Sequence, residues 1–557
     1  MTTEALAAPS ADTGAAVVRE LRTTRMRRRL GDTEWFDVAY RAYLFALVGL
    51  IATVFVSDAI RGQLADELAP DVLVDRGPAI LGVITAVAVA AGVRSGADGG
   101  PVAIEAADVR HLLLAPVARS SVLRAPTLQR VRAAAFAGAL IGGAVGQFVA
   151  IEQPGSRAAW AGAAALAGAA TGAAFIAVAV LVHGWSLSRP AATAMAGALL
   201  VWQIGAAYLS WVGADQRVAG PFDSIGAIAL WGVDADAVDA LGLMVIGAFV
   251  VAAIARCGAL SIEALVRRAD LVSQLRFAAT TQDLRTVVLL RRQLRAETMR
   301  QRPWGGVGRR PRATSPAVAV WQRGARSIRR FPLARLARIA GLAAAGGIAA
   351  AIAYESAPIA VLITVAATFV IGMEGLEPLA QEIDHPDLTD RLGVEPSWLY
   401  GHHLVAPAGM LAVASIVGAI AVTIAAPGLA FGAFSLAVPT AVAGAVGPLV
   451  ATVTDAARPA AIRSTTLTAA PRGDSELLMP PEFAGFSTAM RTLLPVALSA
   501  AAAVPVLVMR ADPGSATAGR VAVGCALYAA GAVVWVRRRD AWGLAVRRFF
   551  AGGRAAT

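Results

Sequence analysis

Residues 158–182 read AAWAGAAALAGAATGAAFIAVAVLV, and none of the side chains in this stretch is charged. About 20 consecutive apolar residues in an α-helix are enough to cross the hydrocarbon core of a bilayer. The stretch therefore predicts a transmembrane helix. The whole chain agrees, since 57% of its 557 residues are hydrophobic and only 16% are charged, whereas soluble proteins carry about 25% charged residues.

The same criterion finds further apolar runs along the chain and predicts an all-α polytopic membrane protein with about twelve transmembrane helices. The first six predicted spans cover residues 40–60, 78–93, 133–151, 158–182, 190–212 and 238–254. The last six cover residues 339–353, 358–373, 404–425, 428–453, 492–508 and 521–536. Residues 256–338 hold 19 arginines and four acidic residues, so we expect a long basic segment that separates two six-helix halves.

The arginines predict the orientation of the spans, because basic residues accumulate in short cytoplasmic loops. With the N-terminus in the cytoplasm, the outer segments hold six arginines and thirteen acidic residues. The inner segments then hold 44 arginines and 25 acidic residues. An odd number of spans would destroy this segregation, so we expect both termini in the cytoplasm.

These predictions divide the chain into five parts. They are a basic amphipathic cytoplasmic segment (1–39), a first six-span half (40–258), a basic cytoplasmic helix and linker (259–338), a second six-span half (339–537) and a basic cytoplasmic tail (538–557). Each half is predicted to carry a cytoplasmic loop after its second span, at 94–132 and at 374–403, and the first half also has a long outer loop at 213–237. The matched positions of the two cytoplasmic loops suggest an internal duplication.

The missing residue types exclude several classes of activity. All 50 basic residues are arginines, and the chain contains neither lysine nor asparagine. A P-loop needs a lysine at the nucleotide phosphates, so we do not expect this chain to hydrolyse ATP by itself. Cys257 and Cys525 form no C-x-x-C pair, which argues against a thiolate metal site, and we expect no cofactor or metal in this chain. The basic charge follows the predicted cytoplasmic side, so anionic lipids rather than nucleic acid are expected partners.

The histidines and glycines favour structural roles. His402 and His403 are adjacent, so on a helix they point about 100° apart and cannot both bind one ion. We interpret them as interfacial residues at the mouth of the ninth span, and His183 in the same way at the inner end of the fourth. The pair Gly142 and Gly146 indicates close helix packing, because small residues spaced by four let membrane helices approach.

The two predicted cytoplasmic loops contain the candidate functional residues. The first reads EAADVRHLLLAPVARSSVLR at 105–124, which predicts a short amphipathic helix broken at Pro116 and followed by a basic turn. The second reads EPLAQEIDHPDLTDRL at 377–392 and is acidic, although it is predicted to face the cytoplasm. Apolar side chains ringed by charges are typical of short helices that dock into grooves, so we expect both loops to contact a partner. The candidate contact residues are Asp108, His111, Leu112, Leu113, Leu114, Pro116, Arg119, Glu377, Glu382, Asp384, His385 and Asp387.

Three motifs resemble the membrane-permease subunits of ABC-type exporters from actinobacteria. They are DVRHLLLAPVAR at 108–119, EPLAQEIDHP at 377–386 and DLRTVVLLRRQL at 283–294. The resemblance implies two fused permease halves in a bacterial plasma membrane that move a hydrophobic or peptide-like substrate outward. It implies that ATP and Mg²⁺ bind to a separate cytoplasmic ATPase subunit, expected as a dimer, into which the two loops dock.

The same resemblance implies two further elements. One is an amphipathic helix before the first span, at residues 17–30 or 34–45, and the other is a re-entrant outer segment at residues 225–231. The second half departs from this plan, since residues 511–519 are too few for a re-entrant segment.

Two other functions remain open on the sequence alone. An ion-coupled secondary transporter would depend on an ion gradient instead of a partner, and a polytopic lipid-modifying enzyme would be active as a single purified chain. Ion-coupled carriers usually have ionisable residues in the middle of their spans. Here Asp58 and Asp239 lie near predicted outer ends and Glu374 lies near an inner end, which favours the permease.

Overall fold

The computed structural model describes residues 16–17, 20–21, 23–24, 27, 70–100, 102–115, 117–150, 154–213, 218–280, 303–304, 315–355, 358–384, 393–456 and 493–555. All secondary structure in these residues is helical. The chain divides into two compact units, Met1–Arg291 (unit 1) and Arg292–Thr557 (unit 2). The division falls within the basic segment that was predicted between the two halves.

Within the described residues, eleven helical segments are long and apolar enough to cross a membrane. They match the second to the twelfth predicted span in order, which confirms the all-α multi-span architecture. The segments are Leu73–Ala97, Arg119–Val149, Arg157–Gly184, Arg189–Trp211, Ala237–Ala259, Leu333–Glu355, Pro358–Gly375, Pro396–Ala425, Pro427–Thr454, Leu493–Ala511 and Ser515–Arg538. The first predicted span, 40–60, lies outside the described residues, as do residues 34–45 and most of 1–39.

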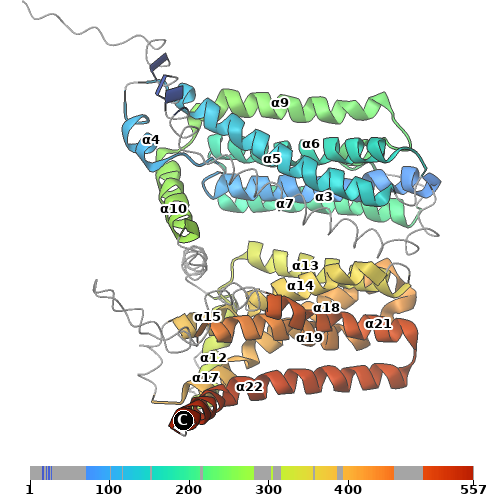
Figure 1. Ribbon diagram of the computed structural model, residues 1–557. Coiled ribbons are helices and arrows are strands. Elements are labelled where there is room, and N and C mark those ends of the chain that lie inside the picture. The colour runs from blue at the N-terminus through green and yellow to red at the C-terminus, as the bar shows by residue number, and fades with distance from the viewer. Residues whose placement is uncertain are drawn as a thin grey trace, which may run out of the picture. The chain divides into compact units, whose positions relative to one another are not determined.

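The described residues of unit 1 form a bundle of five long helices (Figure 1). They are α3 (Pro70–Ala97), α5 (Arg119–Val149), α6 (Arg157–Gly184), α7 (Arg189–Trp211) and α9 (Ala240–Arg256). Helix α6 packs against α3, α5 and α9, and α3 also packs against α7. Helices α4 (Ala106–His111) and α10 (Ile262–Thr280) lie at one end of the bundle, called the α4 end (Figure 1). Helix α8 (Asp223–Ile228), between α7 and α9 in the chain, marks the opposite α8 end.

Helices α5 and α6 approach each other so closely that their contact accepts only glycine at several positions. A Cβ atom on Gly142 would overlap the carbonyl oxygen of Ala164, and one on Gly168 would overlap that of Gly138. A Cβ on Gly146 would lie 2.5 Å from the carbonyl oxygen of Trp160. This contact confirms the interpretation of Gly142 and Gly146 as helix-packing residues.

The tight turn between α5 and α6 has a clear local cause. Gly155 has φ +104°, a backbone conformation that residues with a side chain rarely adopt. The Ser156 side chain then accepts a hydrogen bond from the Ala159 amide at 3.1 Å and so caps α6. The Trp160 indole, which is 1% exposed, donates to the carbonyl oxygen of Pro154 at 3.0 Å.

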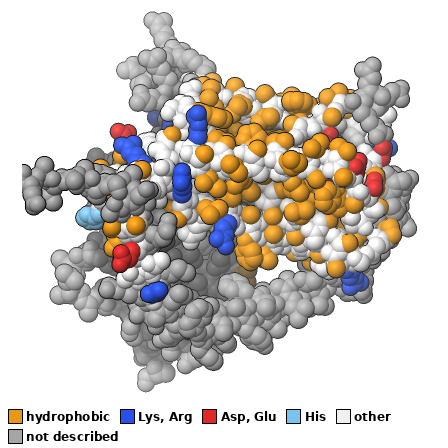
Figure 2. All heavy atoms as spheres, turned by 90° about the horizontal axis from the view of Figure 1, so that it is seen from above, with side chains coloured by type: hydrophobic (Ala, Val, Ile, Leu, Met, Phe, Trp, Pro, Cys, Tyr) orange, Lys and Arg blue, Asp and Glu red, His pale blue; other side chains and the backbone are white. Residues whose placement is uncertain are grey.

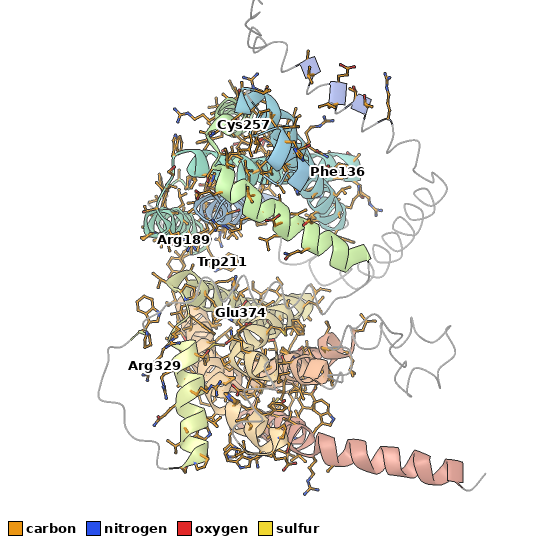
Figure 3. All side chains as sticks on the ribbon, turned by 90° about the vertical axis from the view of Figure 1, so that its left-hand side faces the viewer. Phe136, Arg189, Trp211, Cys257, Arg329 and Glu374 are labelled. Atoms are coloured by element: carbon orange, nitrogen blue, oxygen red, sulfur yellow. The ribbon has the colours of Figure 1, made fainter. Side chains whose placement is uncertain are left out.

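The sides of the unit 1 bundle are apolar, as contact with lipid requires. Figure 2 shows hydrophobic side chains across the middle of one face, with charged side chains gathered toward its ends. Phe136, Leu140 and Ile141 of α5 are 66%, 59% and 68% exposed, and Phe136 lies on the outside of its helix (Figure 3). In water such a surface would drive aggregation, whereas in a bilayer it meets hydrocarbon.

Unit 2 contains a second bundle (Figure 1). Its elements are α12 (Pro316–Ile328), α13 (Leu333–Glu355), η3 (Pro358–Ala360), α14 (Val361–Gly375), α15 (Glu377–Asp384), α17 (Pro396–His403), α18 (Val405–Ala425), η5 (Pro427–Leu429), α19 (Ala430–Ala456), η8 (Ala500–Ala502), α21 (Ala503–Ala511) and α22 (Ser515–Ala555). Helices α12, α15 and α17 lie at one end, called the α15 end, and α21 ends and α22 begins at the opposite α21 end (Figure 1). Helix α22 is a single helix of 41 residues.

The fourth span has the same neighbours in both units. The fourth predicted span of unit 1, α6, packs against the second, third and sixth spans of its half, α3, α5 and α9. Likewise α19, the fourth span of the second half, packs against α14, α18 and α22. Such a shared pattern is what an internal repeat produces.

Candidate functional site

The first predicted partner loop lies against α10 at the α4 end. Leu113 is 5% exposed and belongs to the same apolar cluster as Leu265 of α10, and Leu112 packs against this cluster while remaining partly exposed. Leu114 is 71% exposed. The three leucines were predicted to act together, but their surroundings differ. Leu113 fixes the loop to the bundle, whereas Leu114 is exposed on the surface.

The polar candidates of this loop lie nearer the surface. His111 and Arg119 are exposed and Asp108 is half-buried, while Pro116 lies outside the described residues. Helix α4 ends at His111, before the predicted break, but α5 already begins at Arg119 instead of near residue 133. Arginines end an apolar run without ending a helix, because arginine is a good helix former.

Polar contacts hold α10 and the neighbouring helix ends in place. His183 Nδ1 donates to the carbonyl oxygen of Gly96 at 3.0 Å, and its Nε2 accepts from the Ser261 amide at 3.2 Å. Arg268 of α10 donates to the carbonyl oxygen of Gly100. Burial lowers the pKa of Arg268 from its ordinary value, and the charge of Arg130 lowers it further. His183 thus has a structural role at the end of α6.

The predicted re-entrant segment at 225–231 is largely the short helix α8, which is buried against α3. Ile225 and Ile228 are 3% and 0% exposed. The fully buried Gln203 of α7 donates to the Ala79 carbonyl oxygen at 2.8 Å and to Asp223 Oδ1 at 2.7 Å, and its own oxygen accepts from the Phe222 amide at 3.0 Å. One buried side chain therefore joins α3, α7 and α8.

The second predicted partner loop begins with α15, whose glutamates point into unit 2. Glu377 and Glu382 are 2% and 5% exposed. The Glu382 carboxylate lies 3.0 Å from the guanidinium of Arg323 on α12 and 3.7 Å from His403 Nε2 on α17. Both glutamates are thus engaged within unit 2, and their contact with a partner stays a prediction. Asp384 ends α15, and its side chain, together with His385 and Asp387, lies outside the described residues.

A compact ion-pair cluster lies next to α15. Arg335 of α13 is 7% exposed, and its Nε lies 2.6 Å from the carboxylate of Glu374, which is 2% exposed (Figure 3). The same guanidinium donates to the Glu374 carbonyl oxygen at 3.0 Å and lies 3.7 Å from the centre of the Phe331 ring. Arg338 contacts the other Glu374 oxygen at 2.7 Å, and Glu377 lies 3.9 Å from Arg335. Two arginines therefore balance two buried carboxylates.

The adjacent histidines have different surroundings. His402 Nδ1 donates to the Trp398 carbonyl oxygen at 2.8 Å, and the centres of the His402 and Trp398 rings lie 3.9 Å apart. His403 lies at the predicted mouth of the ninth span, but it is only 2% exposed. Among the described residues, no group of three or more His, Cys, Asp or Glu side chains is placed to hold a metal.

Arg335, Arg338 and Arg323 are not among the site residues predicted from the sequence. A usable signal was present, because Arg335 and Arg338 are spaced by three residues and so share one face of a helix that enters the membrane. A charge at such a position needs a carboxylate partner, and Glu374 ends the next span. The pairing itself depends on how α13 and α14 pack, and no pattern in the sequence gives that.

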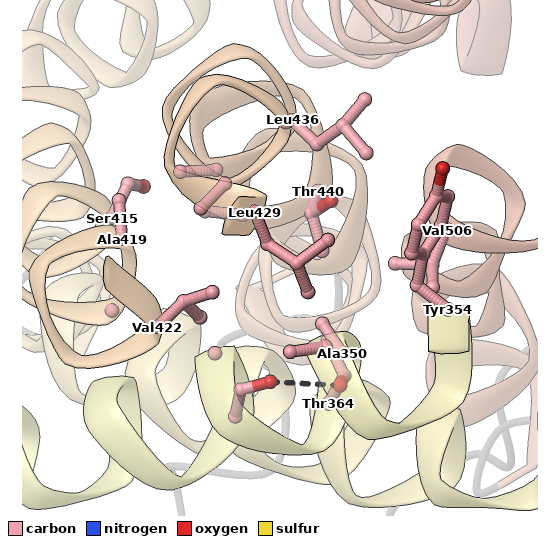
Figure 4. A pocket seen from close by; sticks show the side chains of 18 of the residues that line it. Ala350, Tyr354, Thr364, Ser415, Ala419, Val422, Leu429, Leu436, Thr440 and Val506 are labelled. Carbon is pink, nitrogen blue, oxygen red and sulfur yellow. Dashed lines mark hydrogen bonds between the residues drawn. The ribbon is translucent and has the colours of Figure 1, made fainter. Parts of the chain in front are cut away.

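Unit 2 also contains an apolar cavity of about 350 Å³ (Figure 4). Helices α13, α14, α18, α19 and α21 line it, and among the described lining residues none carries a charge. Several hydroxyls in its wall bond to helix carbonyls: Thr364 donates to Gly346 at 2.9 Å (Figure 4), and Ser415 donates to Leu411 at 2.7 Å. The wall of the cavity therefore offers mostly methyl and methylene groups.

No protein-family model matches the chain, and neither a curated protein nor a solved structure shows significant similarity to it. The chain is a multi-span membrane protein by the length and composition of its helices.

Proposed function

We propose that this chain is the transmembrane permease subunit of an ABC-type exporter, and that a separate cytoplasmic ATPase subunit, bound as a dimer, drives it. One observation supports the proposal most directly. A short helix, α4, is anchored to the bundle at the end where the predicted cytoplasmic arginines lie, and it is followed by an exposed leucine, Leu114. A fixed helix with an exposed apolar residue suits docking into a groove of a partner.

Each unit has contacts through which a push at such a helix would reach the spans. In unit 1 the buried Leu113 packs with α10, which Arg268 ties to the end of α3 through Gly100. In unit 2 α15 follows α14 directly, and Glu374 and Glu377 contact Arg335 at the start of α13. Closure of an ATPase dimer would therefore shift packed helices as units and change which end of the permease is open.

The remaining roles are divided between the permease and its partner. ATP and Mg²⁺ bind to the partner, because this chain has no lysine for a P-loop. The chain itself is a transport subunit without an active site of its own. Both termini lie in the cytoplasm of a bacterial cell, and the arginines of the inner side contact anionic lipids of the plasma membrane.

The proposal is tested by purifying the full chain from its native membrane and identifying the proteins that accompany it. We expect a P-loop ATPase, whose activity the permease stimulates, and no ATP hydrolysis by the permease alone. Turnover by the permease alone, after removal of contaminating ATPases, would contradict the division of labour. Transport that follows an ion gradient and needs no ATPase would favour a secondary transporter instead.

A matched pair of variants tests the docking role of Leu114. Burying a leucine contributes roughly 1.5–3 kcal/mol, so Leu114→Ser should weaken ATPase binding roughly 10- to 100-fold. Leu241→Ser at the α8 end changes a leucine that is 57% exposed, and it should leave ATPase binding unchanged. Leu113→Ser should lower the stability of unit 1 itself. Wild-type affinity in Leu114→Ser would remove α4 from the docking surface.

A further inference from the structure

The cavity of unit 2 lies beside a helix pair whose counterpart in unit 1 is closed. Helices α18 and α19 are the third and fourth spans of the second half, and α5 and α6 hold these places in the first. Helices α5 and α6 meet backbone to backbone at Gly142 and Ala164. In contrast, α18 and α19 both line the cavity, for instance with Ala419 and Thr440.

The ends of the two units differ in the same way. In unit 1 the link between the fifth and sixth spans forms α8, whose Ile228 is fully buried and whose Gly226 leaves no space for a Cβ beside Pro78 of α3. In unit 2 the corresponding link between α21 and α22 comprises only residues 512–514. Pro513 and Gly514 of this link line the cavity, so the cavity reaches the α21 end of the bundle.

The wall of the cavity selects for uncharged, apolar groups. Among its described lining residues none could neutralise a charge, and burying an unpaired charge is costly. Its volume of about 350 Å³ is more than twice that of an engineered apolar cavity of about 150 Å³ that binds benzene. A hydrocarbon chain fits this chemistry and this size.

A polar cluster stands directly beside the short link. Arg520 lies 3.0 Å from Asp512, and the Thr517 hydroxyl donates to the same carboxylate at 2.7 Å. Both charged side chains are well exposed, at 72% and 65%. The side chains of Asp512, Thr517 and Arg520 line a second pocket along α22, and Asp512 directly precedes Pro513, which lines the apolar cavity. The link 512–514 thus connects an apolar cavity to exposed charges, which is the polarity of an amphiphile.

We propose that this cavity binds one acyl chain of a membrane lipid, with the polar head at the Asp512 and Arg520 cluster. Among the described helices of unit 1, α5 and α6 meet backbone to backbone and leave no equivalent space between them. The assignment of this lipid as the transported substrate rests on the permease function proposed above. Binding of the acyl chain does not depend on that function.

The test uses the full-length chain in phosphatidylglycerol vesicles that contain a trace of phosphatidylglycerol with a photoreactive diazirine in one acyl chain. After illumination, mass spectrometry locates the labelled residues. We expect label on cavity residues of α13, α18 and α19, in addition to label from surrounding lipid on the exposed segment 136–141. Label restricted to exposed surfaces would overturn the proposal.

Two glycine variants make the test specific. A Cβ on Gly432, which lines the cavity, or on Gly409, which does not, would meet no atom within 4 Å, so both positions have open space at the start of a side chain. Gly432→Leu fills cavity space and should lower cavity labelling by at least about tenfold, whereas Gly409→Leu should leave it unchanged. Label on segment 136–141 should be equal in both variants.

Equal cavity labelling in Gly432→Leu and wild type would also overturn the proposal. The vesicles contain neither ATPase nor ATP, so this result concerns the cavity alone. The permease function is tested separately by copurification from the native membrane. If no ATPase accompanies the chain there while the cavity is labelled in vesicles, the permease function is contradicted and the lipid site stands.

Discussion

The Nε atom of Arg335 lies 2.6 Å from the carboxylate of Glu374, and this contact joins the first turn of α13 to the last turn of α14. Both side chains are almost completely buried. Removing one partner of a buried ion pair leaves the other charge without compensation, which is far more costly than losing a surface pair. The two helices are therefore fixed to each other at the α15 end.

Replacing Arg335 by Met should destabilise unit 2 strongly. Loss of the guanidinium leaves Glu374 with Arg338 as its remaining cation, and we expect a loss of about 3–5 kcal/mol. The measurement is the midpoint of thermal unfolding in detergent. Arg338→Met is the matched control, because Arg338 is 53% exposed and should cost about 1 kcal/mol or less. Equal midpoints for the two variants would contradict the structural role of Arg335.

A single methyl group should disturb the contact between α5 and α6. In Gly142→Ala the new Cβ meets the Ala164 carbonyl, so the helices must separate, at a cost of roughly 1–3 kcal/mol. Gly162→Ala on α6 is the control, because a Cβ there meets no atom within 4 Å. We expect a lower thermal midpoint only in Gly142→Ala, and an unchanged midpoint would show that the two helices are farther apart than described.

Loss of the Gln203 side-chain amide should loosen α8. In Gln203→Leu the Phe222 amide and the Asp223 carboxylate lose their buried partner, which costs about 1–3 kcal/mol. Hydrogen exchange of residues 222–228 should then become about 10- to 100-fold faster if this segment opens locally. Trp202→Phe removes a hydrogen bond to the Ala219 carbonyl and shrinks a ring system that is 53% exposed, so it should leave exchange at 222–228 unchanged. Equal exchange rates at residues 222–228 in both variants would show that Gln203 does not anchor α8.

Cysteine labelling can establish the orientation of unit 1. Cys257 and Cys525 are buried, and replacing them by Ala gives a background without thiols. In intact cells, a maleimide that does not cross membranes should label Asp234→Cys, which lies in the predicted outer loop. The same reagent should label Glu263→Cys on α10 only after the cells are permeabilised. The reverse pattern would invert the predicted topology.

The sequence allowed the spans to be predicted because a bilayer imposes a minimum length of apolar helix. The ends of the spans were predicted less well. Helix α5 begins at Arg119 instead of residue 133, and the ninth span begins at Pro396 instead of residue 404. Each of these helices continues beyond the hydrocarbon core, where charged and polar residues take over from apolar ones. The predicted ends therefore mark polarity, whereas the observed ends mark hydrogen bonding.

The candidate site could be predicted only in part. The position of α4 followed from its pattern, but the different exposures of Leu113 and Leu114 depend on the contact with α10. The cavity had no signal at all, because apolar residues look alike in sequence wherever they point. On α18, Val413 is 62% exposed on the outer surface whereas Ala419 is 2% exposed and lines the cavity.

Helix α22 has a mechanical consequence. At about 1.5 Å per residue its 41 residues span roughly 60 Å, about twice the thickness of the hydrocarbon core, ~30 Å. Val536, partway along it, is fully buried in a cluster with Tyr400 of α17. The contact can act as the fulcrum of a lever with one arm in the membrane and the other beyond it. If the arm that extends beyond the membrane tilts, Ser515 at the other end of the helix moves in the opposite direction. Ser515 lines the edge of the cavity.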